Sequence, residues 1–121
     1  MLKDLIGARL LDLTDEGILV EKDGKVYRIE IDDDSGDCCG YNEITTNLLC
    51  TKDSRPVITN IEYTVDDEEC DSESAKVVFF GECKPIAEIN TLSSSGSGWG
   101  YGATVTLISK ALNISEVVSS W

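Results

Sequence analysis

The sequence predicts an α+β fold: a mainly antiparallel β-sheet of about six or seven strands, one short helix after an Asp-Cys-Cys motif, and a short C-terminal helix. Three observations predict it. Short segments with alternating apolar and polar residues recur along the chain, a hairpin-type turn sequence joins two of them, and two other segments carry apolar residues at helical spacing. The 121 residues suit a single domain over 1–121, with a core over 1–109 and a C-terminal tail or helix over 110–121.

The N-terminal part is expected to form a β-hairpin. The first strand is expected over residues 6–13, where a short helix is the alternative, and the second begins at 17–20. Asp23-Gly24 then favours a type I′ turn, because both turn positions of that type need positive φ. Between 26 and 31 polar and apolar residues alternate, so one face of the strand after the turn is predicted to be apolar.

Two acidic stretches, residues 32–37 and 66–74, are expected to be loops. Between them, the segment 42–50 has apolar residues at helical spacing and predicts a short helix, although its three β-branched residues oppose one. The segment 56–65 has the composition of a strand. The residues expected on one face of that strand are Val57, Thr59, Ile61 and Tyr63.

The C-terminal third is predicted to hold three further strands, over residues 75–80, 86–92 and 103–108. A glycine-serine hairpin loop over 93–102, which carries two aromatic residues, is expected between the last two.

The tail after these strands is expected to be a helix. Asn113 and Glu116 have the spacing of a capping pair, in which the two side chains satisfy free N–H groups at a helix start. The helix is expected to dock on the domain, and a detachable partner-binding tail is the alternative. Its apolar face would carry Ile114, Val117, Val118 and Trp121.

The charge of the chain is unevenly distributed. The net charge is −13, and residues 32–73 alone contribute −11, from 13 acidic and 2 basic side chains. A field of this sign repels nucleic acid and anionic membranes and attracts basic surfaces. No apolar run approaches the roughly 18 residues of a membrane span, and no signal peptide is recognised. We therefore expect no direct nucleic-acid binding, no membrane association and a cytoplasmic location.

The residues available for chemistry are limited. The chain has no histidine, which removes the commonest general base and metal ligand, and it has five cysteines, an odd number that favours free thiols. A calcium loop starting at Asp32 would place Gly36 and Asp37 in the reverse of the required order. A zinc site would lack any C-x₂-C pair. We expect no metal, no cofactor, no catalytic residue and no enzymatic activity.

A family resemblance rests on short motifs. After the early hairpin come Asp37-Cys38-Cys39, the aromatic Tyr41 and the acidic Glu43, and later the segment 97–101, Ser-Gly-Trp-Gly-Tyr, precedes a final strand. The chain thereby resembles, over roughly residues 5 to 108, a small family of uncharacterised domains encoded by bacteriophages and by bacteria that carry phage genes. The match departs from the family at 99–102 and at 113–121. The resemblance implies a viral or prophage origin and a compact α+β domain, and it implies no activity.

Two functions follow as hypotheses. The first is a phage accessory protein whose acidic loops bind a basic surface on a host protein, for instance a bacterial defence nuclease, by imitating the charge of nucleic acid. The residues expected to bind the partner are Asp32, Asp33, Asp34, Asp66, Asp67, Glu68, Glu69 and Asp71. The second is a nucleotide-like ligand module that uses the loop 96–102, with Trp99 or Tyr101 stacking on the ligand. A homo-oligomer, and acidity that only keeps the chain soluble, remain open.

The stretch 32–41 is expected to divide its roles. Asp32, Asp33 and Asp34 should be exposed, and Asp37 should accept backbone hydrogen bonds in a structural role. At least one of Cys38 and Cys39 should be buried beneath the hairpin, with Tyr41 completing the structural motif.

Overall fold

The protein is a two-layered β-sandwich. The computed structural model describes residues 2–34, 41–66, 72–94 and 103–120, and these contain nine strands in two antiparallel sheets. The only helical segments among them are two short 3₁₀ turns, Leu2–Leu5 and Lys52–Ser54. The predicted α+β class is therefore wrong, because the described structure is nearly all antiparallel β.

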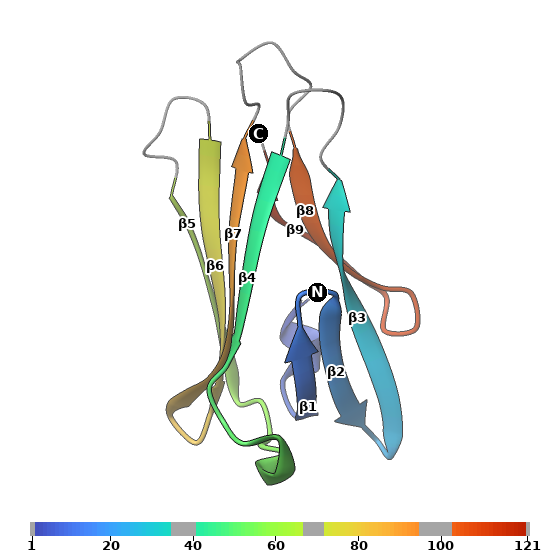
Figure 1. Cartoon of the computed structure of the whole chain (residues 1–121). Helices are drawn as coiled ribbons and strands as arrows, with labels where there is room; N and C mark the ends of the chain where they lie inside the picture. The colour runs from blue at the N-terminus through green and yellow to red at the C-terminus, as the bar shows by residue number, and fades with distance from the viewer. Residues whose placement is uncertain (1, 35–40, 67–71, 95–102, 121) are drawn as a thin grey trace.

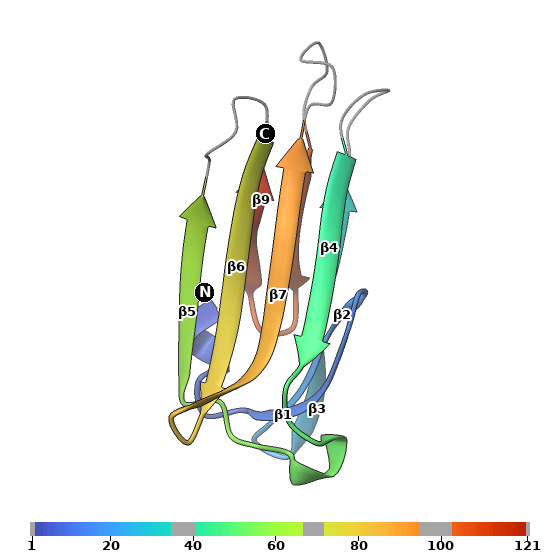
Figure 2. The same cartoon turned by 60° about the vertical axis from the view of Figure 1, so that its left-hand side comes forward.

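The two sheets are arranged face to face. The sheet of β4, β7, β6 and β5 lies on the left in Figure 1 and in front in Figure 2, and the other strands form the second layer. The five-stranded sheet consists, in order, of β1 (Arg9–Thr14), β2 (Gly17–Lys22), β3 (Lys25–Asp34), β8 (Thr104–Ser109) and β9 (Ile114–Ser120). The four-stranded sheet consists of β4 (Tyr41–Leu48), β7 (Lys84–Ser94), β6 (Ser72–Gly81) and β5 (Asn60–Asp66).

The hydrophobic core lies between the two sheets and is formed by the side chains of every second residue along the strands. Ile18 and Ile29 from one sheet and Val77, Phe79 and Ile89 from the other are fully buried. Burial of each such side chain contributes about 1.5–3 kcal/mol relative to exposure. This alternation is the physical basis of the sandwich, since each strand offers one apolar and one polar face.

The predicted hairpin is confirmed. Asp23 and Gly24 have φ of 54° and 77°, the positive values that a type I′ turn needs, and β2 pairs with β3 across them. In β3, Ile29 and Ile31 are buried while the residues between and beside them are exposed, as the alternation predicted.

The five-stranded sheet is staggered around β3. The first part of β3 pairs with β2, from Lys25 to Glu30, and its last part pairs with β8, from Glu30 to Asp34. Gly17 begins β2 where the β1–β2 turn meets β3, and a Cβ there would lie 2.5 Å from the carbonyl oxygen of Ile29. Beyond this point β3 continues without β2 beside it, which leaves a gap in the sheet.

The helix predicted over 42–50 is wrong. The segment forms β4 (Tyr41–Leu48), which pairs with β7 along its whole length. Ile44, Thr45 and Thr46 are β-branched and fit a pleated strand better than a helix. Tertiary pairing thus overrode the helical spacing of the apolar residues.

The C-terminal helix is wrong as well. Residues 114–120 form β9, which pairs with β8 and is an edge strand of the five-stranded sheet. Asn113 has a φ of 56° and closes the turn before β9 instead of starting a helix. Ile114 and Val118 are 1% exposed, so residues 114–120 supply core residues and do not form a detachable tail.

The remaining boundaries shift without changing the strand assignments. The stretch 32–37 is not a loop throughout, because its first three residues belong to β3. The predicted strands 75–80 and 86–92 are confirmed and are longer, as β6 and β7. In the 56–65 segment the regular strand begins only at Asn60, and Ile58, which was not assigned to the expected face, is fully buried.

No helix in the described ranges is long and apolar enough to cross a membrane.

Candidate functional site

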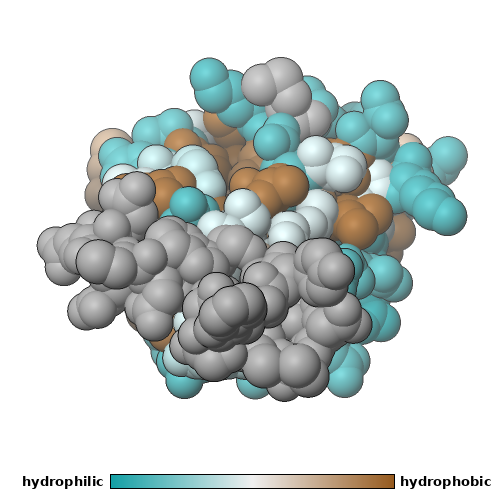
Figure 3. Space-filling model, turned by 90° about the horizontal axis from the view of Figure 1, so that it is seen from above, coloured by the Kyte–Doolittle hydropathy of each residue, from teal (hydrophilic) through white to brown (hydrophobic). Residues whose placement is uncertain are grey.

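The stretches that carry the predicted site residues all join strands at one end of the sandwich, which we call the loop end (Figure 1). Three connections reach it, between β3 and β4, between β5 and β6, and between β7 and β8. Seen from above this end, hydrophilic side chains of the described residues lie around the rim (Figure 3). The strand termini that define the loop end are Asp34, Tyr41, Asp66, Ser72, Ser94 and Thr104.

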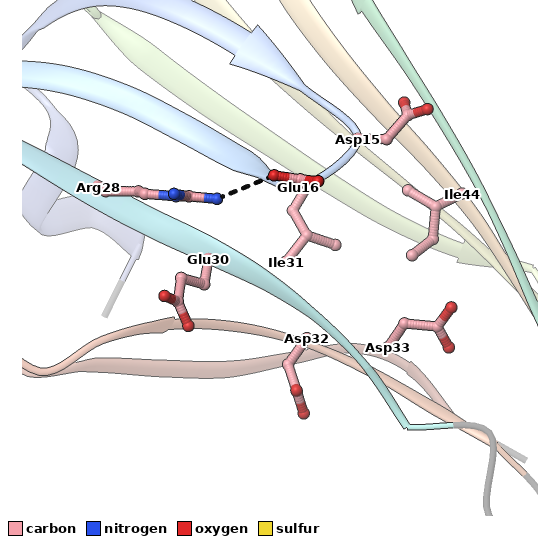
Figure 4. Close-up of a pocket in the computed structure, with 8 residues that line it drawn as sticks. All are labelled: Asp15, Glu16, Arg28, Glu30, Ile31, Asp32, Asp33 and Ile44. Carbon is pink, nitrogen blue, oxygen red and sulfur yellow. Dashed lines mark hydrogen bonds and ion pairs between the residues drawn. The ribbon is translucent and has the colours of Figure 1, made fainter.

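An open pocket of about 510 Å³ lies beside the loop end, in the gap left by the stagger of the five-stranded sheet. Its walls come from the β1–β2 turn, from β3 and from β4 of the opposite sheet (Figure 4). We call it the acidic pocket, and it is lined by Asp15, Glu16, Arg28, Glu30, Ile31, Asp32, Asp33 and Ile44.

Alternation along β3 divides the carboxylates of the acidic pocket. Ile31 and Asp33 extend toward the side where Ile44 of β4 lies, whereas Glu30 and Asp32 lie on the other side of the β3 ribbon (Figure 4). Asp33 thus continues the inward stripe of Ile29 and Ile31 at the point where that stripe reaches solvent. The pocket has an apolar floor and an acidic wall.

The charge of the acidic pocket is only weakly compensated. Five carboxylates and one guanidinium line it, a net charge of −4. The guanidinium of Arg28 lies 3.4 Å from the Glu16 carboxylate, and both side chains are largely exposed, so this pair contributes at most about 1 kcal/mol. The uncompensated carboxylates favour a cationic partner.

Asp33 is also held by the opposite sheet. The side-chain amide of Asn42 on β4 donates a hydrogen bond to Asp33 Oδ1 over 2.6 Å and another to the carbonyl oxygen of Thr104 over 3.1 Å. Ser93 on β7 donates to Asn42 Oδ1 over 2.6 Å. These bonds join both sheets at the loop end.

A second hollow lies between the edge strands β5 and β9 and is mainly apolar. Its volume is about 180 Å³. The Tyr63 hydroxyl donates to the carbonyl oxygen of Val118 across it. Partial burial raises the pKa of Tyr63, which is 45% exposed, above its ordinary value, and the nearby carboxylates of Glu73 and Glu116 raise it further. The hollow is lined by Leu2, Lys3, Ile61, Tyr63, Glu116, Val117 and Val118.

The structure places several of the predicted site residues. Asp32, Asp33 and Asp34 are exposed, as predicted, although they lie on a strand and Asp33 is hydrogen-bonded. Asp66 ends β5, and Tyr41 begins β4 with 44% of its side chain exposed. The candidates that lie outside the described residues are Asp37, Cys38, Cys39, Asp67, Glu68, Glu69, Asp71, Trp99 and Tyr101.

The residues that surround Asp33, among them Asn42 and Ser93, were not predicted as site residues from the sequence. These residues share one trait. Each is a polar residue at a position that faces the interior of the sandwich, close to the loop end. In β7 the stripe runs from Ile89 through Thr91 to Ser93, and in β3 it runs from Ile31 to Asp33. A change from apolar to polar at inward positions could have been recognised, but only with the strand faces assigned.

Metal-ligating groups do not gather in the described ranges. No three Asp, Glu, Cys or His side chains there lie close enough to hold one ion, even though five carboxylates line the acidic pocket. Cys50 is half-buried and Cys83 is exposed, and both are free thiols.

Comparison with known proteins gives one match. A family model described as a domain of unknown function, DUF7448, matches residues 3–107. These residues include the acidic pocket and every strand except β9 and the end of β8. No curated protein and no solved structure matches the chain.

Proposed function

This chain belongs to the DUF7448 family, a family of domains of unknown function, and we propose that it is a non-enzymatic accessory protein of a phage or prophage that binds a basic surface on a host protein. The loop end is the binding surface. The acidic pocket and the two acidic stretches, 32–37 and 66–74, supply the charge.

One arrangement supports the proposal: the two acidic stretches of the sequence join strands at the same end of the sandwich. Residues 32–73, with their net charge of −11, include both the end of β3 and the connection between β5 and β6. The strand ends that flank both connections lie together at the loop end (Figure 1). Connections held by a rigid sandwich are a common place for binding residues.

The physical basis of binding is electrostatic attraction. Clustered carboxylates raise the local concentration of a basic partner and speed its association, and salt weakens both effects. Along a strand, residues two apart lie on one side at a spacing of about 6.8 Å. Carboxylates repeated in this way can occupy a basic surface that otherwise holds phosphates.

A non-enzymatic role fits the residues at the loop end. The chain has no histidine, and the acidic pocket is lined by carboxylates, one arginine and two isoleucines. This set offers no nucleophile with an adjacent base.

The phage or prophage setting comes from the Asp-Cys-Cys resemblance, and it gives the proposal its most concrete form. A defence nuclease of the host carries a basic surface for nucleic acid. An acidic protein bound there would compete with the nucleic acid and inhibit cleavage.

The experiment compares two variants of equal net charge. The first neutralises three acids in the acidic stretches, Asp32→Asn, Asp67→Asn and Glu68→Gln. The second neutralises three acids toward the opposite end, near the ends of β2, β4 and β6: Asp23→Asn, Asp53→Asn and Glu82→Gln. Wild type and both variants are immobilised and exposed to bacterial lysate at about 50 mM and about 500 mM NaCl.

The proposal expects captured proteins that wild type and the second variant retain at low salt and release at high salt. The first variant should bind a purified captured protein with an association rate about tenfold lower, and nucleic acid should compete with wild type for it. Equal loss of binding in both variants, or capture that is insensitive to salt, would contradict the proposal.

A further inference from the structure

A chain of polar side chains crosses the interior of the sandwich below the loop end. Thr91 Oγ1 lies 2.8 Å from Ser119 Oγ, which lies 2.7 Å from Ser93 Oγ, which lies 2.6 Å from Asn42 Oδ1. Asn42 Nδ2 then lies 2.6 Å from Asp33 Oδ1. The chain passes from β7 to β9, back to β7, to β4 and to β3, and so links both sheets.

The chemistry of these groups fixes the direction of every bond. The amide nitrogen of Asn42 must face Asp33, because the reverse orientation would place its oxygen against a carboxylate and against the carbonyl oxygen of Thr104. Asn42 Oδ1 is then the acceptor for Ser93. Ser93 therefore accepts from Ser119, and Ser119 accepts from Thr91. All donors are directed toward the Asp33 carboxylate.

The interior members of this chain are deeply buried. Ser93 and Ser119 are fully buried, and Thr91 is 4% exposed. A buried hydroxyl without a partner costs about 1–3 kcal/mol, so each member depends on its neighbours. The bond to Asp33 is charge-assisted, and it anchors the chain at the surface.

We propose that Asn42 is a positioning residue for the binding surface: it fixes the carboxylate of Asp33 in the wall of the acidic pocket. A carboxylate held in this way has lost its rotational freedom before a partner arrives, so less entropy is lost on binding. The inference rests on the proposed function for the role of Asp33 in binding, but the fixed geometry stands without it.

The first measurement begins with the unaltered protein. The side-chain amide protons of Asn42 should exchange with solvent at least about tenfold more slowly than those of the exposed Asn60, because Asn42 Nδ2 donates to both Asp33 and the Thr104 carbonyl oxygen. Asp33→Ala should remove much of this protection and shift the Asn42 amide resonances, whereas Asp32→Ala should leave them unchanged. Equal exchange at Asn42 and Asn60 would overturn the proposal.

The second measurement exchanges the two side chains. Asn42→Asp places two carboxylates in contact and should lower the denaturation midpoint. Adding Asp33→Asn should restore part of the loss, because an amide and a carboxylate again face each other, while the hydrogen bond to the Thr104 carbonyl oxygen stays lost. A purely structural role for Asn42, independent of Asp33, predicts no such rescue. Absence of rescue would contradict the proposal.

The third measurement tests positioning in binding, with a synthetic deca-arginine peptide as the probe. Asp33→Asn alone should weaken peptide binding several-fold relative to the wild-type protein. Added to Asn42→Ala, in which Asp33 is no longer fixed, it should weaken binding by a smaller factor. Equal factors in the two backgrounds would overturn the positioning role. If the wild-type protein does not bind the peptide at low salt, the proposed function fails. The exchange and rescue measurements still test whether Asn42 fixes Asp33.

Discussion

Tyr63 connects the two sheets at the edge opposite the acidic pocket. Its ring lies in the hollow between β5 and β9, and its hydroxyl donates to the backbone of Val118. Loss of the phenolic proton would remove this donor and place a charge near Glu73 and Glu116. Burial of the ring is the main cause of its raised pKa, and the two carboxylates add to it.

Tyr63 therefore predicts a pH dependence of stability. Because the folded-state pKa is raised above 10.0, the stabilisation is fully present below about pH 10 and is lost as the pH rises through the folded-state pKa. Tyr63→Phe should remove this part of the alkaline decrease in the denaturation midpoint. The difference in ultraviolet absorbance between wild type and Tyr63→Phe during titration should give a midpoint above 10.0. Tyr41→Phe, which also alters a half-exposed tyrosine, is the control, and a Tyr63 midpoint at or below 10.0 would refute the prediction.

Asp33 shows how far single residues could be interpreted from sequence. Its exposure was predicted, because three consecutive aspartates are rarely buried. Its hydrogen bond to Asn42 was not predicted. The two residues lie on different sheets, and sequence periodicity does not specify how two sheets stack. Asp33, and not Asp32, makes the hydrogen bond because it lies on the same side of β3 as Ile31. The side on which each residue lies could be assigned once the register of the hairpin was known.

At the level of elements, β4 and β9 were the two errors, and they share a cause. Both segments have apolar residues that suit a helical period over a few residues, and both are rich in β-branched side chains. Over seven or eight residues the two periods are hard to separate, so composition was the better guide. The β2–β3 hairpin was predicted correctly, because its turn sequence has a specific conformational requirement that the structure meets.

Adjacent valines on β9 provide a direct test of the strand. Successive residues of a strand face opposite sides, and accordingly Val118 is 1% exposed and Val117 is 55% exposed. Val118→Ala should destabilise the protein by about 2 kcal/mol because it leaves a cavity between the sheets. Val117→Ala should change stability by less than about 0.5 kcal/mol. Urea denaturation measures both, and similar losses for the two variants would instead favour a helix that buries both side chains.

For the molecule as a whole, one distribution of charge has two opposite consequences. The net charge of −13 destabilises the folded state through self-repulsion, and the same charge attracts a basic partner. Salt weakens both effects, because it shortens the distance over which charges interact. The total charge and its concentration in the middle third were evident from the sequence. That the strand ends flanking the two acidic stretches lie at one end of the sandwich depends on topology.

The last prediction follows from this repulsion. Raising NaCl from about 10 mM to about 100 mM shortens the screening length from about 30 Å to about 10 Å, so the melting temperature should rise by a few degrees, the scale of about 1 kcal/mol. Tetramethylammonium chloride should act equally, because screening depends on ionic strength and not on the cation. At low salt, neutralisation of Asp32, Asp67 and Glu68 should raise the melting temperature more than neutralisation of Asp23, Asp53 and Glu82. The first three have acidic neighbours in the sequence, whereas each of the second three lies within two residues of a lysine. Stabilisation by sodium alone would indicate a bound cation instead, and an equal effect of the two variants would show that the acidic stretches carry no special repulsion.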